Sequence, residues 1–192
     1  MRVVGGKARG MTIMVPSVPD IRPTTDLVRG AMFSMLEARG AVEGKRVLDL
    51  FAGSGALGIE ALSRGATHAD LVEQNSKACA TIRKNLMAIH LEDQASVVAL
   101  PVARALGGLN GSYDLVFMDP PYANASEMTD VIDRLVTGNL LDEGSTVVVE
   151  QSSRNRRDFA RAGEMRLEQE KTYGDTAVSI YIVDHDMKEL HR

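Results

Sequence analysis

The sequence has little cysteine, little histidine and no long apolar run, and each shortage excludes a class of protein. Its single cysteine, Cys79, excludes an internal disulfide framework, and with four scattered histidines it gives no metal-ligand spacing. No apolar run approaches the roughly 20 residues that span a bilayer, and residues 1–10 lack the apolar stretch of a signal peptide. We therefore expect a cytoplasmic protein with no metal and no membrane partner, and we expect Cys79 to be a core residue.

Charge is distributed unevenly along the chain. Residues 1–46 contain eight Lys or Arg and four Asp or Glu, a net charge of +4, and the rest carries −8, which gives the total of −4. A basic segment on an acidic body is typical of an arm that contacts phosphates, and it is equally compatible with a solvated cationic face. A second basic cluster is expected on a helix and consists of Arg154, Arg156, Arg157 and Arg161.

The segment 1–40 is predicted to be a small extension of one main domain. Short apolar runs at 3–4 and 11–15 flank a glycine-rich stretch, which predicts a hairpin with Lys7 and Arg9 near its tip. Three prolines then mark irregular chain, and a helix is predicted from about 25 to 38. We expect a hairpin-and-helix extension over 1–40 and the main domain over 41–192.

From residue 46 onward the pattern alternates between strand and helix. Strands are predicted at 47–50, 69–73, 96–100, 113–118 and 146–150, with helices at 56–63, 76–89 and 126–136 and a helical turn after 100. This alternation predicts a parallel sheet with helices on both faces. Two further strands, at 164–171 and 176–183, predict a closing antiparallel hairpin. We therefore expect a Rossmann-like α/β fold with a mostly parallel, seven-stranded sheet.

The most informative motif is Asp-Pro-Pro-Tyr, which follows the apolar run 113–118. Two prolines restrict φ to a narrow negative range and donate no backbone hydrogen bond, so they end the strand abruptly. Asp119, the carbonyls of Pro120 and Pro121 and the ring of Tyr122 are thus presented at a strand's carboxyl end, where α/β sheets bind ligands. The arrangement suits a flat ring with an exocyclic amino group.

A glycine-rich loop after the first strand of the main domain predicts a second ligand. Gly53 and Gly55 allow a sharp bend and a close approach of the backbone, and with Gly58 they match a dinucleotide-binding pattern. Asp49 ends the strand, where a carboxylate repels a pyrophosphate but receives a cation, and this favours S-adenosylmethionine over NAD. Glu73 ends the next predicted strand, at the spacing from the first loop glycine that is typical of an acid accepting ribose hydroxyls.

Together the two motifs predict methyl transfer to an amino group. An exocyclic purine amine is a poor nucleophile because its lone pair is delocalised into the ring. Two acceptors on its hydrogens would aim that lone pair at the sulfonium methyl, which is positioning plus electrostatic stabilisation. Asp119 is a candidate acceptor of the proton, and Tyr122 would stack on a base removed from its helix.

Several segments of the chain resemble the RsmD family of class I S-adenosylmethionine-dependent methyltransferases. They are residues 1–10, Arg-Pro-Thr-Thr-Asp at 22–26, the block 49–66, Asp-Pro-Pro-Tyr at 119–122 and Tyr-Gly-Asp-Thr at 173–176. The resemblance covers nearly the whole chain. It implies methylation at N2 of one guanine of bacterial 16S ribosomal RNA, guanine 966 in reference RNA numbering. It further implies a target within the small ribosomal subunit or an assembly intermediate.

The resemblance also implies roles for individual residues. Cofactor-binding roles fall on Asp49, Phe51, Gly53, Gly55, Glu73 and Leu100, and catalytic roles on Asp119, Pro120 and Tyr122. RNA contacts fall on Lys7, Arg9, Arg22, Thr24, Asp26, Arg29 and Pro121. One departure is that the family's acid after the third strand is absent, so backbone groups near Leu100 would recognise the adenine.

Two alternatives remain open at this point. One is adenine-N6 methylation of RNA or DNA, since the Asp-Pro-Pro-Tyr motif serves that reaction too. The other is a non-catalytic ribosome-assembly or RNA-binding module, although Asp49, Glu73 and Asp119 together favour an enzyme. We expect the protein to be a monomer.

Overall fold

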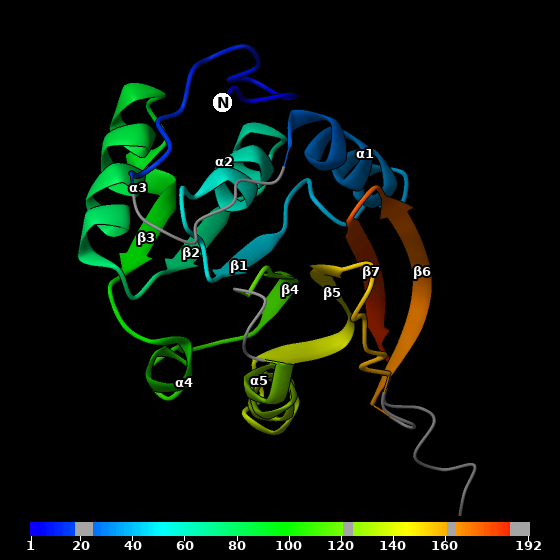
Figure 1. The fold of residues 1–192 in the computed structure, drawn as a ribbon. Coiled ribbons are helices and arrows are strands. Elements are labelled where there is room, and N and C mark those ends of the chain that lie inside the picture. The colour runs from blue at the N-terminus through cyan, green and yellow to red at the C-terminus, as the bar shows by residue number, and fades with distance from the viewer. Residues whose placement is uncertain (18–24, 121–124, 161–163, 185–192) are drawn as a thin grey trace, which may run out of the picture.

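The computed structural model describes residues 1–17, 25–120, 125–160 and 164–184. A seven-stranded sheet has the order β3-β2-β1-β4-β5-β7-β6 (Figure 1). Its strands are β1 (Arg46–Leu50), β2 (His68–Val72), β3 (Ala95–Val98), β4 (Tyr113–Met118), β5 (Leu141–Ser152), β6 (Met165–Tyr173) and β7 (Thr176–Val183). The helices are α1 (Asp26–Glu37), α2 (Ala56–Ser63), α3 (Ser76–Ala88), α4 (Val102–Ala105) and α5 (Ala125–Thr137), with a 3-10 turn, η1 (Glu92–Gln94).

The sheet is parallel from β3 to β5 and antiparallel at its C-terminal hairpin. Strands β1 to β5 pair in parallel, whereas β7 is antiparallel to both β5 and β6. The predicted fold class is confirmed. The strand order reverses between β1 and β4, and α/β sheets bind ligands beyond the carboxyl ends of strands at such a point.

Both faces of the sheet are covered by helices. Figure 1 shows α1, α2 and α3 on one face and α4 and α5 on the other. Successive β4 side chains alternate between the two faces, since Leu115 and Phe117 pack in the core under α1–α3 whereas Val116 and Met118 pack in the core under α4 and α5. This double burial explains why the parallel strands are continuous apolar runs.

Residues 1–17 form the predicted hairpin, called the N-terminal hairpin, which packs on the α1–α3 face. Arg2 and Thr12 form an antiparallel bridge pair, and Val3 N donates to Met11 O at 3.0 Å. Three of its apolar side chains are buried in the core under α1–α3: Val3, Ala8 and Ile13. The hairpin is therefore docked on the helices that cover this face of the sheet.

Two buried side chains of α2 hold this hairpin. Glu60 accepts hydrogen bonds from Val4 N at 2.8 Å and Gly5 N at 2.7 Å, and Ser63 Oγ donates to Gly5 O at 2.6 Å. Gly6 has a φ of +72°, and a Cβ atom there would lie 1.9 Å from Ser63 O. A larger residue at Gly6 would therefore separate the hairpin from α2.

The prediction that the second basic cluster lies on a helix is wrong. Among the described residues, Arg154 lies in a turn after β5, and Arg156 and Arg157 lie in the irregular loop that follows it. Arg161 lies outside the described residues. The Gln151 side chain donates to Arg157 O and accepts from Arg157 N, each at 2.9 Å. This amide satisfies backbone groups that a helix would have paired internally.

Three further features bear on the class of protein. In the part of the chain that the structure describes, no helix has the length and apolarity to cross a membrane. Over the same residues, His, Cys, Asp and Glu form no group that could hold a metal ion. Cys79 is a core residue, as predicted, because it is 1% exposed and its burial raises the pKa of the thiol.

Candidate active site

Four acidic residues lie at the carboxyl ends of four neighbouring strands, and we call them the acid row. Asp49 lies in β1 and Glu150 in β5, whereas Glu73 and Asp119 directly follow β2 and β4. The strand register places Glu73, Asp119 and Glu150 at one level of the sheet and Asp49 two residues below it. Three of these acids were predicted from the sequence, and the structure brings them to one edge.

The loop between β1 and α2 has a strained backbone. Phe51, Gly53 and Gly55 have φ values of +62°, +54° and +76°. A left-handed aromatic residue is uncommon, and such strain clusters at functional sites. Gly55 caps α2 without a side-chain hydrogen bond. Because the N–H of Gly58 is bonded to Asp49, the N–H groups of Ala56 and Leu57 are those of the first turn that can donate to a ligand.

Asp49 is a buried carboxylate at the floor of the acid row. It is 2% exposed, and its Oδ2 accepts a hydrogen bond from Gly58 N at 2.8 Å. Burial raises the pKa of Asp49 to about 7, the Gly58 N–H opposes this, and the charge of Glu73 adds to it. No described residue forms an ion pair with Asp49. A cationic ligand would therefore be stabilised here.

Glu73 fixes the glycine loop against β2. It is 8% exposed, and its two oxygens accept from Gly53 N at 2.9 Å and from Asn75 N at 2.7 Å. A carboxylate oxygen can accept more than one hydrogen bond. The arrangement thus leaves capacity for ligand hydroxyls beside the loop.

Asp119 follows β4 and has a pKa well above its usual range. Burial of its carboxyl group is the largest cause, followed by the nearby negative charges of Glu150 and Asp49. Hydrogen-bond donors on a substrate amine would favour its charged form. Pro120, the next residue, is buried. Pro121 and Tyr122 lie outside the described residues.

Leu100 is partly buried, and its backbone N–H is already bonded. Leu100 N donates to Val98 O at 3.1 Å, and its side chain packs against the core under α4 and α5. A contact from this N–H to an adenine would require exchange of that bond.

The N-terminal hairpin presents two predicted RNA contacts at its surface. Lys7 and Arg9 are both exposed, and Lys7 Nζ donates to Gln94 Oε1 at 3.0 Å. Asp26, at the start of α1, has a side chain that is 53% exposed. Arg22 and Thr24 lie outside the described residues.

The prediction that Arg29 contacts RNA is wrong. Its side chain is 0% exposed, and its guanidinium pairs with Glu60 at 3.3 Å and Asp26 at 2.9 Å. It also donates to the backbone oxygen of Arg2. A fully buried guanidinium cannot contact an RNA backbone, so Arg29 is a structural residue that ties α1 to α2 and the hairpin.

Sequence reasoning missed three polar residues that support this edge of the sheet or the N-terminal hairpin. Glu150 ends the apolar run of β5 as Asp119 ends that of β4, and this parallel was a usable signal. Glu60 is an acid inside the wholly buried helix α2, which indicates a buried ion pair. Asn85, a buried residue of α3 that bonds to the glycine loop, carried no comparable signal.

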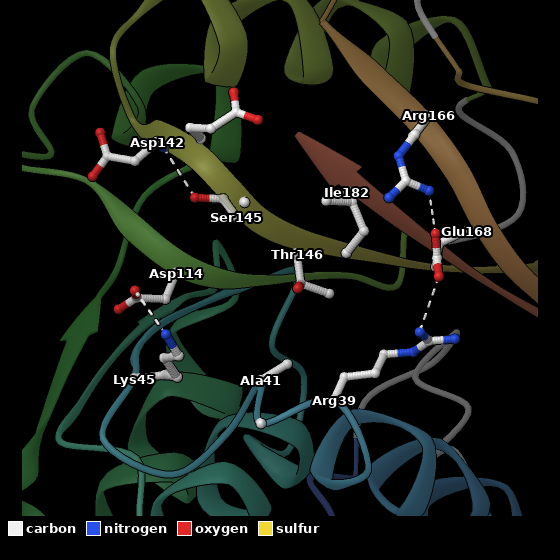
Figure 2. A pocket seen from close by; sticks show the side chains of 13 residues that line it. Arg39, Ala41, Lys45, Asp114, Asp142, Ser145, Thr146, Arg166, Glu168 and Ile182 are labelled. Carbon is white, nitrogen blue, oxygen red and sulfur yellow. Dashed lines mark hydrogen bonds and ion pairs between the residues drawn. The ribbon is translucent and has the colours of Figure 1, made fainter. Parts of the chain in front are cut away.

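A cavity of about 340 Å³ lies at the opposite edge of the sheet (Figure 2). Five of its charged side chains pair with one another: Lys45 with Asp114 at 3.5 Å, Arg39 with Glu168 at 3.2 Å, and Arg166 with Glu168. It lies at the amino ends of β4 and β5, away from the acid row. Its position and paired charges disfavour it as the active site.

Comparisons with known proteins find relatives that match most of the chain. The family described as Conserved hypothetical protein 95 matches residues 1–182. The chain is 34% identical over 181 residues to Ribosomal RNA small subunit methyltransferase D of Escherichia coli (strain K12), covering 94% of this chain and 89% of that protein. It is 34% identical over 184 residues to YlbH of Bacillus subtilis (strain 168), covering 94% and 98%. The solved structure of yhhF from Escherichia coli has a TM-score of 0.85 and 31% identity, covering 96% and 98%.

Proposed function

The chain belongs to the RsmD family, and from this membership and the acid row we propose that it methylates small-subunit ribosomal RNA. The methyl donor is S-adenosylmethionine, and the acceptor is the exocyclic N2 of a guanine, of the guanine 966 type. The observation that carries the proposal is the placement of Asp49, Glu73 and Asp119 at one sheet edge. A relative of the chain is named as a methyltransferase of small-subunit ribosomal RNA.

The cofactor residues fit a cationic nucleoside. S-adenosylmethionine supplies a methyl group on a positively charged sulfur. Asp49 is a buried carboxylate without an ion pair to any described residue, so it can stabilise the positive charge of this ligand. Glu73 can accept the ribose hydroxyls while it holds Gly53. Phe51 and Leu100 border the same end of the sheet.

The target amine is assigned to Asp119. Its carboxylate and the carbonyl of Pro120 accept the two N–H bonds of the amine and so direct the nitrogen lone pair away from the ring. Because burial raises the pKa of Asp119, this carboxylate is a better proton acceptor than an exposed one. It takes the proton that the nitrogen loses on methylation. Tyr122 stacks on the flipped base, and Pro121 borders it.

RNA contacts are assigned to the N-terminal extension. Residues 1–40 form the extension and residues 41–192 the methyltransferase domain. Lys7 and Arg9 are exposed on the docked hairpin, where they can neutralise phosphates. We also assign contacts with the cofactor or the target to Arg22, Thr24 and Asp26. The acceptor is an assembled or partly assembled 30S subunit, and the protein acts as a monomer in the cytoplasm.

The decisive experiment measures cofactor binding and then methyl transfer. Calorimetry with S-adenosylmethionine is followed by incubation with labelled cofactor and 30S subunits that lack the native modification. Mass mapping of the 16S RNA should place one new methyl group on a guanine N2. Methylation of an adenine N6 instead would overturn the guanine assignment. Cofactor binding with no transfer to 30S subunits or to free 16S RNA would support a non-catalytic assembly module.

A further inference from the structure

Asn85 of α3 joins two segments that are far apart in the sequence. Its side chain is buried, with 1% exposure. Oδ1 accepts from Met14 N at 2.7 Å, and Nδ2 donates to Met14 O at 2.9 Å and to Ser54 O at 3.1 Å. Both donor hydrogens of the amide are therefore used, one on the N-terminal hairpin and one on the glycine loop.

Ser54, at one end of this bridge, lies in the strained glycine loop between β1 and α2. Ser54 is 5% exposed and sits between Gly53 and Gly55, both with left-handed φ values. The left-handed Phe51 in the same loop persists only where surrounding contacts hold it. The Asn85 amide supplies such a contact from outside the loop.

The Met14 end lies in the hairpin that carries Lys7 and Arg9. Two other anchors of the hairpin, Glu60 and Ser63, belong to α2 and bond to hairpin backbone groups. Among the described hydrogen bonds, those of Ser63 do not reach the glycine loop. Asn85 thus differs from Ser63, because its side-chain amide bonds to both the hairpin and the glycine loop.

We propose that Asn85 is a positioning residue that makes the N-terminal hairpin part of the cofactor site. It holds the Ser54 carbonyl, and hence the glycine loop, in the conformation that binds S-adenosylmethionine, and it links that conformation to the docked hairpin. The inference rests on the proposed function. Because coupling between two sites is reciprocal, cofactor binding then steadies the hairpin that meets RNA.

The test compares Asn85→Ala with Ser63→Ala in the full chain. Asn85→Ala leaves Ser54 O and both Met14 groups without their partner, so the dissociation constant for S-adenosylmethionine should rise about tenfold. Ser63→Ala removes a hairpin anchor only and should change that constant by less than about twofold. Calorimetry is performed well below each variant's unfolding midpoint, and the midpoint is measured in parallel.

A measurement on the wild-type chain covers the case in which Asn85→Ala does not fold. Amide hydrogen exchange at Met14 N, which is bonded to Asn85, should slow when S-adenosylmethionine binds. Exchange at Val3 N, which is bonded to Met11 O within the hairpin, measures the opening of the hairpin's own hydrogen bonds. Unchanged exchange at Met14, or wild-type cofactor affinity in Asn85→Ala, overturns the inference alone. Equal weakening by Ser63→Ala would show that hairpin docking in general, and not the Asn85 amide, sets the cofactor affinity, and this would overturn the role assigned to Asn85. A wild-type chain that binds no cofactor would overturn the proposed function as well.

Discussion

Arg29 and Glu60 form an ion pair inside the protein, with Arg29 Nε 3.3 Å from Glu60 Oε2 and side chains 0% and 1% exposed. The same carboxylate accepts from the backbone of Val4 and Gly5 and from Arg64 Nε at 2.8 Å. One acid therefore joins α1, α2 and the N-terminal hairpin. A buried pair stabilises only while both partners remain.

Glu60→Ala should be strongly destabilising because it leaves the Arg29 guanidinium buried without this carboxylate. We expect the free energy of unfolding in urea to fall by about 3–5 kcal/mol. Glu37→Ala is the matched control, since Glu37 also pairs with Arg64, at 2.7 Å, but is 46% exposed. The control should lose less than about 1 kcal/mol. Similar losses in the two variants would contradict the prediction that the buried Glu60 contributes more to stability than the exposed Glu37.

The burial of Arg29 could have been predicted from the sequence. Met32, Phe33 and Leu36 follow Arg29 at helical spacing and are all buried, so the cation lies on the apolar face of α1. Spacing alone therefore carried the signal that Arg29 is buried. It did not identify the partner, because Glu60 belongs to a different helix, α2. Long-range pairs of this kind depend on how helices pack.

The acid row was largely predictable for a different reason. Apolar strands that end in Asp or Glu indicate a polar sheet edge, and parallel strands bring those ends together. Asp49, Glu73 and Asp119 were predicted in this way. Asn85 was not, because its position in the middle of a helix looks ordinary until the fold places Met14 and Ser54 beside it.

Asp49→Asn should stabilise the protein at high pH. The pKa of Asp49 is raised from 3.8 to about 7, so the folded state favours the protonated form. Its contribution to stability is fully present below about pH 4 and is lost as the pH rises through about 7. At pH 8 the variant should gain up to roughly 4 kcal/mol, and the gain should shrink at pH 5.

Urea unfolding at both pH values checks this prediction, with Asp93→Asn on the exposed turn η1 as the control. The same Asp49→Asn variant should bind S-adenosylmethionine more weakly at pH 8, since it lacks the negative charge. A variant that is equally stable at both pH values relative to wild type would show that Asp49 is not held in a raised-pKa state.

Asp119→Ala should abolish methyl transfer and leave cofactor affinity nearly unchanged. Asp119 follows β4, whereas Asp49 and Glu73, which we propose bind the cofactor, lie in β1 and directly after β2. Loss of the amine acceptor should lower kcat by at least about 10²-fold. Single-turnover transfer to 30S subunits and calorimetry with the cofactor separate the two effects. Turnover close to that of wild type would contradict the proposed mechanism.

Glu150→Gln should shift the pH dependence of the reaction. Burial and the charges of Glu150 and Asp49 raise the pKa of Asp119, and the mechanism that we propose needs Asp119 in its charged form. Removal of the Glu150 charge lowers that pKa, so the acidic limb of kcat/KM should move to lower pH. Asp114→Asn, at the opposite end of β4, is the control and should leave the limb in place. A limb that does not move would mean that Glu150 does not influence the reacting carboxylate.

Replacing both Lys7 and Arg9 with Gln should weaken binding to 30S subunits and reduce its salt dependence. Each lost phosphate contact should lower the slope of log K against log salt by about 0.7–0.9. Lys45→Gln is the control, since Lys45 is a partly exposed cation paired with Asp114 at the opposite sheet edge. The slope of the control should match that of wild type. An unchanged slope in the double variant would mean that the hairpin tip does not meet RNA, and the basic segment would then be a solvated face.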